Sequence, residues 1–169
     1  STKAAATIVA HQYAAQHGIG IVTLRPFGVY DEAEPPHKIF CRAILNMLRG
    51  QALELSPCLQ QRDYCYAGDI AEAVVMVLEN ESLRNNIFNL GTGKMRTLYH
   101  YIEEIRRRAA PDAIVNYGAL PYRDNEIWAP EPDLRRTHER LLWQSRHSLE
   151  CGLNKTIAWF RENAHHYPD

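Results

Sequence analysis

Long hydrophobic runs and an excess of charge of one sign are both missing from this sequence. Its apolar runs are far shorter than the ~20 residues that cross a bilayer, and no charged-then-apolar leader opens the chain. The 20 acidic and 19 basic residues nearly cancel, to a net charge of −1 with histidine neutral. That balance excludes a dominant electrostatic footprint for nucleic acid or anionic lipid. We therefore expect neither a nucleic-acid nor a membrane partner.

The sequence also lacks the spacings of common metal, redox and hydrolytic sites. Its four cysteines form no C-x-x-C pair, which is typical of reduced thiols in a cytoplasmic protein. The eight histidines are dispersed, with no H-x-x-x-H beside a carboxylate, so we expect no metal site. Neither a G-x-S-x-G elbow nor a Walker motif occurs. These absences favour a soluble, cytoplasmic chain of 169 residues, forming one domain or a piece of a larger one.

Helical and strand-like patterns alternate along the chain, which indicates an α/β fold. The chain enters its first helix directly, over residues 2–16, and we expect Gly18 to end it. The apolar run from Ile19 to Leu24, closed by Arg25-Pro26, predicts a parallel strand buried on both faces, followed by a loop over 27–37. Further helices are expected over 38–49, 70–78 (opened or capped by Asp69), 97–109, 134–142 and 149–163, and strands over 53–55, 64–66, 87–90 and 113–117.

One glycine-rich turn requires a test for dinucleotide binding. The dinucleotide fingerprint is G-x-G-x-x-G between a strand and a helix, so that backbone amides can approach the pyrophosphate. Gly91-Thr92-Gly93 follows the expected strand 87–90, but Arg96 stands at the third glycine position and no acidic residue for the ribose follows. We interpret the segment as a tight strand-to-helix turn, with a phosphate cradle as the alternative.

Two arginines stand where a long charged side chain is unusual. Arg62 lies in an expected strand, where it either pairs with a local carboxylate such as Asp63 or holds a phosphate through two parallel hydrogen bonds. Arg123 lies in an irregular, aromatic-rich stretch. The two arginines would clamp one diphosphate if the fold brings them together. The triple arginine at 106–108 is interpreted instead as a solvated helix face.

Six segments, in order, together resemble the C-terminal half of the extended short-chain dehydrogenase/reductase family, the NAD(P)-dependent nucleotide-sugar epimerases, dehydratases and 4-ketoreductases. No single segment is specific, but the set covers essentially the whole chain. The segments are Ser1-Thr2-Lys3-Ala4-Ala5 (end of Y-x-x-x-K), Leu24-Arg25-Pro26-Phe27-Gly28-Val29-Tyr30 (L-R-P-F-N-V-Y-G), Gln61–Ile70 (R-D-[FY]-[VI]-[YH]-V-x-D-[VIL]), Phe88–Gly93 (F-N-[IL]-G-[ST]-G), Arg123, Glu126 and Asp133 (R-x-x-D…A-D-x-S), and Ser148–Leu153 to Trp159-Phe160 (S-L-E-E-G-L…T-I-x-W-[FY]).

The resemblance implies a cofactor, NAD or NADP, whose glycine-rich cradle is not in this chain. In that family a tyrosine is the acid/base at the reacting sugar carbon, and a lysine binds the nicotinamide ribose and lowers the tyrosine pKa. Lys3 matches that lysine, so the resemblance implies a catalytic and cofactor-binding role for it. The tyrosine would stand four residues earlier. Pro26, Phe27 and Val29 are implied as the floor of the nicotinamide pocket.

The resemblance also implies a nucleotide-sugar site formed by Gly28, His37, Arg62, Arg123 and Glu126. Three positions depart from the family pattern. Gly28 replaces the usual asparagine and removes an amide that contacts substrate, Asp31 replaces the usual glycine after Tyr30, and Glu126 replaces the commoner aspartate.

The implied architecture is the C-terminal part of a Rossmann-like doubly wound sheet with the small substrate-binding subdomain. Residues 1–37 and about 64–90 would belong to the Rossmann side, and about 38–63 and 91–169 mostly to the subdomain. The implied activity is hydride transfer at a sugar carbon, with this chain as the substrate-binding half of an epimerase, dehydratase or 4-ketoreductase and inactive alone. The alternative is a non-catalytic fragment that binds a nucleoside diphosphate weakly or serves as an oligomerisation module. We expect a homodimer through the helix 2–16.

Overall fold

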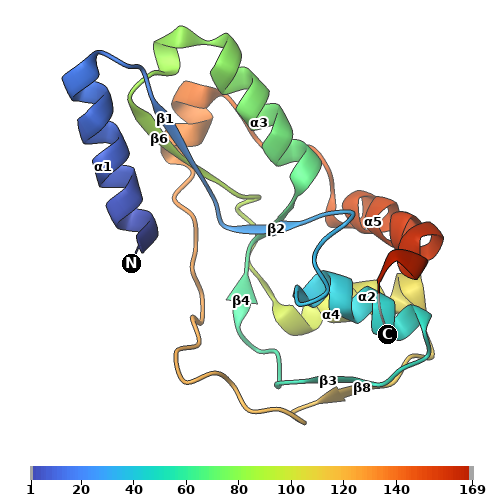
Figure 1. Ribbon diagram of the computed structural model, residues 1–169. Coiled ribbons are helices and arrows are strands. Elements are labelled where there is room, and N and C mark those ends of the chain that lie inside the picture. The colour runs from blue at the N-terminus through green and yellow to red at the C-terminus, as the bar shows by residue number, and fades with distance from the viewer. Residues whose placement is uncertain (1, 168–169) are drawn as a thin grey trace.

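The computed structural model describes residues 2–167, and helices and parallel strands alternate along them (Figure 1). The expected α/β class is confirmed; Ser1, the first residue of the Y-x-x-x-K resemblance, lies outside the described residues. The α-helices are α1 (Thr2–His17), α2 (Ile39–Leu48), α3 (Ala67–Glu79), α4 (Leu98–Ala109) and α5 (Leu149–Asn163). The strands are β1 (Val22–Pro26), β2 (Gly28–Tyr30), β3 (Leu53–Leu55), β4 (Gln61–Arg62), β5 (Tyr64–Tyr66), β6 (Asn86–Leu90), β7 (Arg96–Thr97) and β8 (Val115–Tyr117). The short helical turns are η1 (Glu81–Leu83), η2 (Thr137–Leu141, a π-helix) and η3 (Ala164–His166).

The strands form two-stranded pairs, and β1 changes neighbour as it continues into β2. β1 pairs in parallel with β6, β2 with β5 and β3 with β8, whereas β4 and β7 are antiparallel. The N–H of Phe27 donates to the carbonyl of Leu90 at 3.0 Å, and the next N–H, of Gly28, donates to the carbonyl of Asp63 at 2.9 Å. Ligands of open parallel sheets bind at the carboxyl ends of strands where neighbours change. The topology therefore predicts a site beside residues 26–28.

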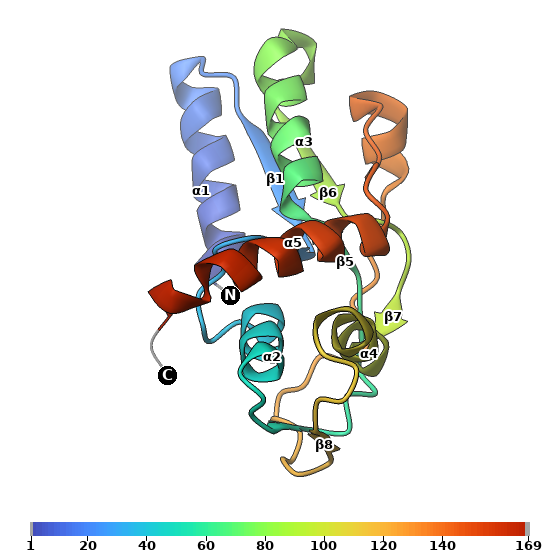
Figure 2. The same cartoon turned by 90° about the vertical axis from the view of Figure 1, so that its right-hand side faces the viewer.

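Two clusters of buried side chains support this arrangement. The larger joins α2, α4 and α5, with Phe40, Ile102 and Phe160 at its centre. The other lies between the β1–β6 pair and α3 and includes Phe88 and Trp143. In Figure 2, α5 crosses between the two parts, with α1, α3, β1 and β6 above it and α2 and α4 below it.

Two helices, α4 and α5, begin at residues whose hydroxyl side chains cap them. The Thr97 side chain accepts from the N–H of His100 at 3.2 Å, and the Ser148 side chain accepts from the N–H of Cys151 at 3.1 Å. Such caps satisfy backbone donors that a helix leaves without a partner in its first turn. The expected helix over 149–163 is confirmed. In contrast, α2 begins after Lys38 with no side-chain cap.

Several expected boundaries are wrong, each for a local reason. The first strand begins at Val22 and not at Ile19, because the N–H of Ile19 bonds the Ala14 carbonyl and leaves the Ile19 side chain 51% exposed. The expected loop 27–37 contains β2, since Gly28 pairs with β5. The helix expected from residue 70 begins at Ala67, which puts Asp69 in its first turn instead of at its cap.

Three further expectations change on the C-terminal side. The helix expected over 134–142 is reduced to the π-helix η2, and the strand expected over 113–117 begins at Val115. The arginine run is not uniformly solvated, because the Arg108 side chain is only 9% exposed and pairs with Glu104 and Glu150. Over residues 2–167 no helix combines the length and the apolar character that crossing a bilayer requires.

Candidate functional site

The carboxylate of Asp63 lies buried between β4 and β5, 1% exposed, and is held by the glycine turn after β6. It accepts the N–H of Thr92 at 2.9 Å, the N–H of Gly93 at 2.8 Å and the hydroxyl of Thr92 at 2.5 Å. A Cβ at Gly91 would lie 2.6 Å from one carboxylate oxygen, so only glycine permits this approach. The tight-turn interpretation is confirmed, and the cradle alternative is wrong, because these amides already bind an internal anion.

The backbone on both sides of Asp63 is fixed by one phenol from α4. Tyr101 is fully buried; its hydroxyl donates to the Arg62 carbonyl at 3.1 Å and accepts the N–H of Tyr64 at 3.3 Å. Burial raises the pKa of Tyr64 to about 12 and also raises the pKa of Tyr101. The phenols of Tyr64 and Tyr101 therefore stay protonated near neutral pH. The direction in which Arg62 leaves the chain is therefore set by α4 and by the turn after β6.

One interpretation of the sequence pairs Arg62 with a local carboxylate such as Asp63. The structure does not show an Arg62–Asp63 pair. The Arg62 guanidinium forms an ion pair with Glu126, and the same side chain donates to the carbonyls of Gln61, at 2.7 Å, and Ile127. The two charged side chains are 22% and 13% exposed. The correction has a simple cause: Asp63 is already fully engaged by the turn, while Glu126 lies on a segment beside β4.

The irregular segment that carries Arg123 and Glu126 is bound to the chain just before Arg62. The N–H of Leu59 donates to the hydroxyl of Tyr122 at 3.1 Å, and the N–H of Gln61 donates to the carbonyl of Trp128 at 2.7 Å. The rings of Tyr122 and Trp128 meet edge to face, 4.8 Å apart. These contacts bring Arg123 to the same region as Arg62, although 61 positions separate them in the sequence.

The fold brings four of the five implied substrate residues to one cavity of about 480 Å³, which we call the basic cavity. His37, Arg62, Arg123 and Glu126 all line it. Lys38, just before α2, and Arg42, in the first turn of α2, line it as well. Five basic side chains therefore line the basic cavity. The one carboxylate that lines it, Glu126, is paired with Arg62.

The fifth residue, Gly28, lines a neighbouring cavity of about 380 Å³, which we call the aromatic cavity. Phe27, Val29, Phe40 and Tyr64 line it too, together with the carboxyl of Glu34. Lys38, Ile39, Arg62 and Tyr64 line both cavities, so the two spaces adjoin. The aromatic cavity lies where β1 gives way to β2, as the strand topology predicts.

Gly28 could not be an asparagine in this backbone. A Cβ at position 28 would lie 2.5 Å from the carbonyl oxygen of Asp63 and 2.8 Å from the Tyr64 ring. Glycine at this departure from the family pattern therefore permits the close approach of β2 to β5.

The residues implied for cofactor binding are only partly together. Phe27 and Val29 line the aromatic cavity and Pro26 ends β1, a placement that suits an apolar floor under a flat ring. Lys3 is exposed near the start of α1 and lines neither cavity. The glycine turn offers no site for a dinucleotide pyrophosphate, because its amides bind Asp63. The apolar lining at Phe27 and Val29 fits the nicotinamide end of NAD(P).

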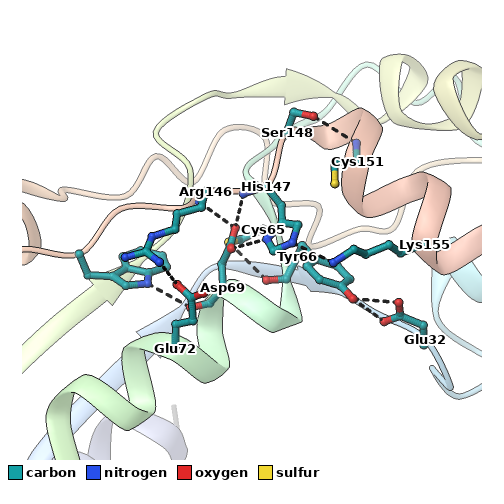
Figure 3. Close-up of polar contacts among 11 residues, drawn as sticks. Glu32, Cys65, Tyr66, Asp69, Glu72, Arg146, His147, Ser148, Cys151 and Lys155 are labelled. Carbon is teal, nitrogen blue, oxygen red and sulfur yellow. Dashed lines mark hydrogen bonds and ion pairs between the residues drawn. The ribbon is translucent and has the colours of Figure 1, made fainter. Parts of the chain in front are cut away.

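Asp69 is a second buried carboxylate that collects several polar contacts (Figure 3). The sequence predicts this residue only at the start of a helix. Asp69 is 1% exposed and accepts the backbone N–H groups of Arg146 and His147, at 3.1 Å each, and the Nδ1 of His147 at 2.6 Å. Lys155 from α5 approaches the Nε2 of His147 at 3.0 Å. A carboxylate only accepts, so the Nδ1–H of His147 donates to Asp69. The cluster fastens the segment before α5 to the start of α3.

The sequence gives no motif for this cluster, because Asp69 and His147 are 78 positions apart and the histidines are dispersed. Among residues 2–167 no group of three or more His, Cys, Asp or Glu side chains is placed to hold a metal ion.

Comparison with known proteins shows the family. The model of the NAD dependent epimerase/dehydratase family matches residues 1–91, more than half of the chain. The chain therefore belongs to this family, and the resemblance seen in the sequence is confirmed.

Among curated relatives, the chain is 28% identical over 173 residues to a trifunctional UDP-glucose 4,6-dehydratase/3,5-epimerase/reductase of Arabidopsis thaliana, covering 100% of this chain and 25% of that protein. It is 29% identical over 166 residues to a UDP-glucuronate 4-epimerase of Thermodesulfobacterium geofontis, covering 96% and 50%. The solved UDP-glucose 4-epimerase of Thermotoga maritima, with UDP-glucose, superposes with a TM-score of 0.85 at 25% identity, covering 93% of this chain and 51% of that one. The fold is thus Rossmann-like, and the chain spans between 25% and 51% of these relatives' length.

We predict that Gly28→Ala destabilises the chain by about 1–3 kcal/mol, because the added methyl group overlaps backbone that β5 holds in place. Gly28→Asn, which restores the residue usual in the family, meets the same overlap. Urea unfolding of each variant measures the loss. The control is Gly20→Ala, whose methyl group has side-chain atoms of the exposed Arg84 as its nearest neighbours and not backbone. Equal stability of Gly28→Ala and wild type would contradict the close approach of β2 to β5.

We predict that His147→Ala lowers the free energy of unfolding by about 1–3 kcal/mol, because buried Asp69 loses its side-chain donor. His138→Ala, at an exposed histidine in η2, is the matched control and should leave stability unchanged. Thermal denaturation of the two variants makes the comparison, and an equal effect would show that the Asp69 cluster does not fasten the chain.

Proposed function

We propose that this chain is the substrate-binding half of an NAD(P)-dependent nucleotide-sugar epimerase, dehydratase or 4-ketoreductase. The observation that carries the proposal is the meeting of Arg62 and Arg123 in the basic cavity with His37 and Glu126. The substrate would be a nucleoside diphosphate joined to a sugar, and the reaction a hydride transfer at a carbon of that sugar. NAD(P), when bound, would accept or return the hydride.

The charges of the basic cavity suit a diphosphate. Arginine presents a planar fork of donors that matches phosphate oxygens, and its charge persists at any physiological pH. Glu126 holds the guanidinium of Arg62 in one orientation, so less side-chain freedom is lost when a phosphate binds. Lys38 and Arg42, at the start of α2, add further positive charge to the cavity.

The remaining roles carried by the resemblance belong to the same proposal. Lys3 would act with a tyrosine upstream of residue 1, and Pro26, Phe27 and Val29 would contact the nicotinamide. We also propose a cytoplasmic homodimer formed through α1. Its exposed Ile8, Val9 and Tyr13, each more than half accessible, are apolar side chains that an interface would cover.

A second candidate is a non-catalytic chain that binds a nucleoside diphosphate weakly or serves as an oligomerisation module. One observation favours weak binding: Arg62 already donates to Glu126 and to two backbone carbonyls. A phosphate would have to compete with these partners. Turnover of a nucleotide sugar by this chain with added NAD would exclude the second candidate.

We predict that UDP or dTDP binds the folded chain, and that Arg62→Ala and Arg123→Ala each weaken binding by about tenfold, because each removes a charge-assisted contact to phosphate. Isothermal titration calorimetry at low salt measures both affinities. Arg136→Ala removes an exposed arginine that does not line the basic cavity, and it should bind as wild type does. Absence of binding by the folded wild-type chain, or unchanged affinity in both cavity variants, would contradict the proposed site.

A further inference from the structure

The two adjoining cavities differ in charge, and that difference assigns them different parts of a substrate. Basic side chains gather in the basic cavity, where a diphosphate would bind. The aromatic cavity is lined by rings, by Arg62 and Lys38 at its shared border, and by the carboxyls of Asp63 and Glu34. Asp63 is fully engaged by the glycine turn. Glu34 therefore supplies the carboxyl that a ligand in the aromatic cavity would meet.

Glu34 has unused hydrogen-bonding capacity. Its Oε2 is buried and has no hydrogen-bond partner within residues 2–167. Burial raises the pKa of the Glu34 carboxyl to about 7, with Asp31 adding to the rise and with Lys38 and the backbone of Cys41 opposing it. A buried acceptor without a partner is costly, and a ligand hydroxyl would satisfy it once the Glu34 side chain turns this oxygen toward the aromatic cavity that the residue lines.

We propose that Glu34 is a specificity-determining residue that selects an uncharged, hydroxyl-bearing sugar and rejects a uronic acid. The inference rests on the proposed function, because it needs the nucleoside diphosphate to bind in the basic cavity. A sugar hydroxyl can donate to the Glu34 carboxylate. A sugar carboxylate would instead place a second negative charge beside it, where Arg62 is already paired with Glu126.

Proteins similar to this chain differ in whether the sugar of their nucleotide sugar carries a charge. One relative named above is a UDP-glucuronate 4-epimerase, and one solved neighbour holds UDP-glucose. The charge that each sugar brings is therefore a property on which family members differ, and the aromatic cavity of this chain carries an acidic residue where that difference would be read.

Calorimetric titration at pH 8, where the Glu34 carboxyl is mostly ionised, tests the inference with UDP, UDP-glucose and UDP-glucuronic acid. The wild-type chain should bind UDP-glucose about tenfold more tightly than UDP-glucuronic acid. In Glu34→Gln the preference should fall to about twofold, chiefly because UDP-glucuronic acid binds better, while the affinity for UDP itself is unchanged.

Two further variants keep the test specific. Glu131→Gln removes an acidic residue that is close in sequence to the cavity-lining Pro130 and lines neither cavity, so it should retain the wild-type preference. Glu34→Asp keeps the charge and should retain most of the preference, which separates a charge effect from a loss of fold.

Each outcome has a distinct meaning. UDP binding with no preference between the two sugars, or with a preference that Glu34→Gln leaves unchanged, would overturn this inference alone. Failure of UDP to bind the folded wild-type chain would overturn the proposed function and this inference with it.

Discussion

The buried carboxylate of Asp63 is the interaction on which the rest of the site depends. A negative charge can leave water here only because two amides and a hydroxyl of the Thr92–Gly93 turn replace its hydration. That contact fixes the start of β5 against the end of β6, and Tyr101 holds the residues on either side. Arg62 therefore leaves the chain in a fixed direction, toward the basic cavity. The N–H groups of Thr92 and Gly93 thus bind an internal anion.

Two buried aspartates therefore stabilise two different parts of the fold. Asp63 joins the parallel strands where they change neighbours, and Asp69 joins the start of α3 to the segment that leads into α5. Because α5 belongs to the larger cluster of buried side chains and α3 to the other, the second contact also connects those clusters. Each charge is stabilised by backbone N–H groups, whose positions are set by the fold and do not depend on side-chain order.

The sequence predicts the elements that local chemistry determines and misses those that depend on distant partners. Ser148 caps α5 and Thr97 caps α4, so those helices follow from the sequence. The α/β class and the family likewise follow from ordered motifs. In contrast, β2 exists only because Gly28 meets β5, and the partner of Arg62 is Glu126 because Asp63 is already bound elsewhere. Spacing gives no sign of either pairing, nor of the contact between Asp69 and His147. The roles proposed for Arg62, Arg123 and Lys3 rest on the resemblance and on the cavity, and binding measurements must test them.

The most direct test of the account is amide hydrogen exchange at Thr92 and Gly93, followed by NMR in the wild-type chain and in Asp63→Asn. An asparagine keeps the shape of the side chain but turns an N–H₂ group toward donors, so the turn should lose its hold on β5. The account predicts that both amides exchange at least about tenfold faster in Asp63→Asn, while the exposed-site control Asp124→Asn leaves them protected. Unchanged protection of both amides in Asp63→Asn would contradict the claim that this carboxylate organises the site.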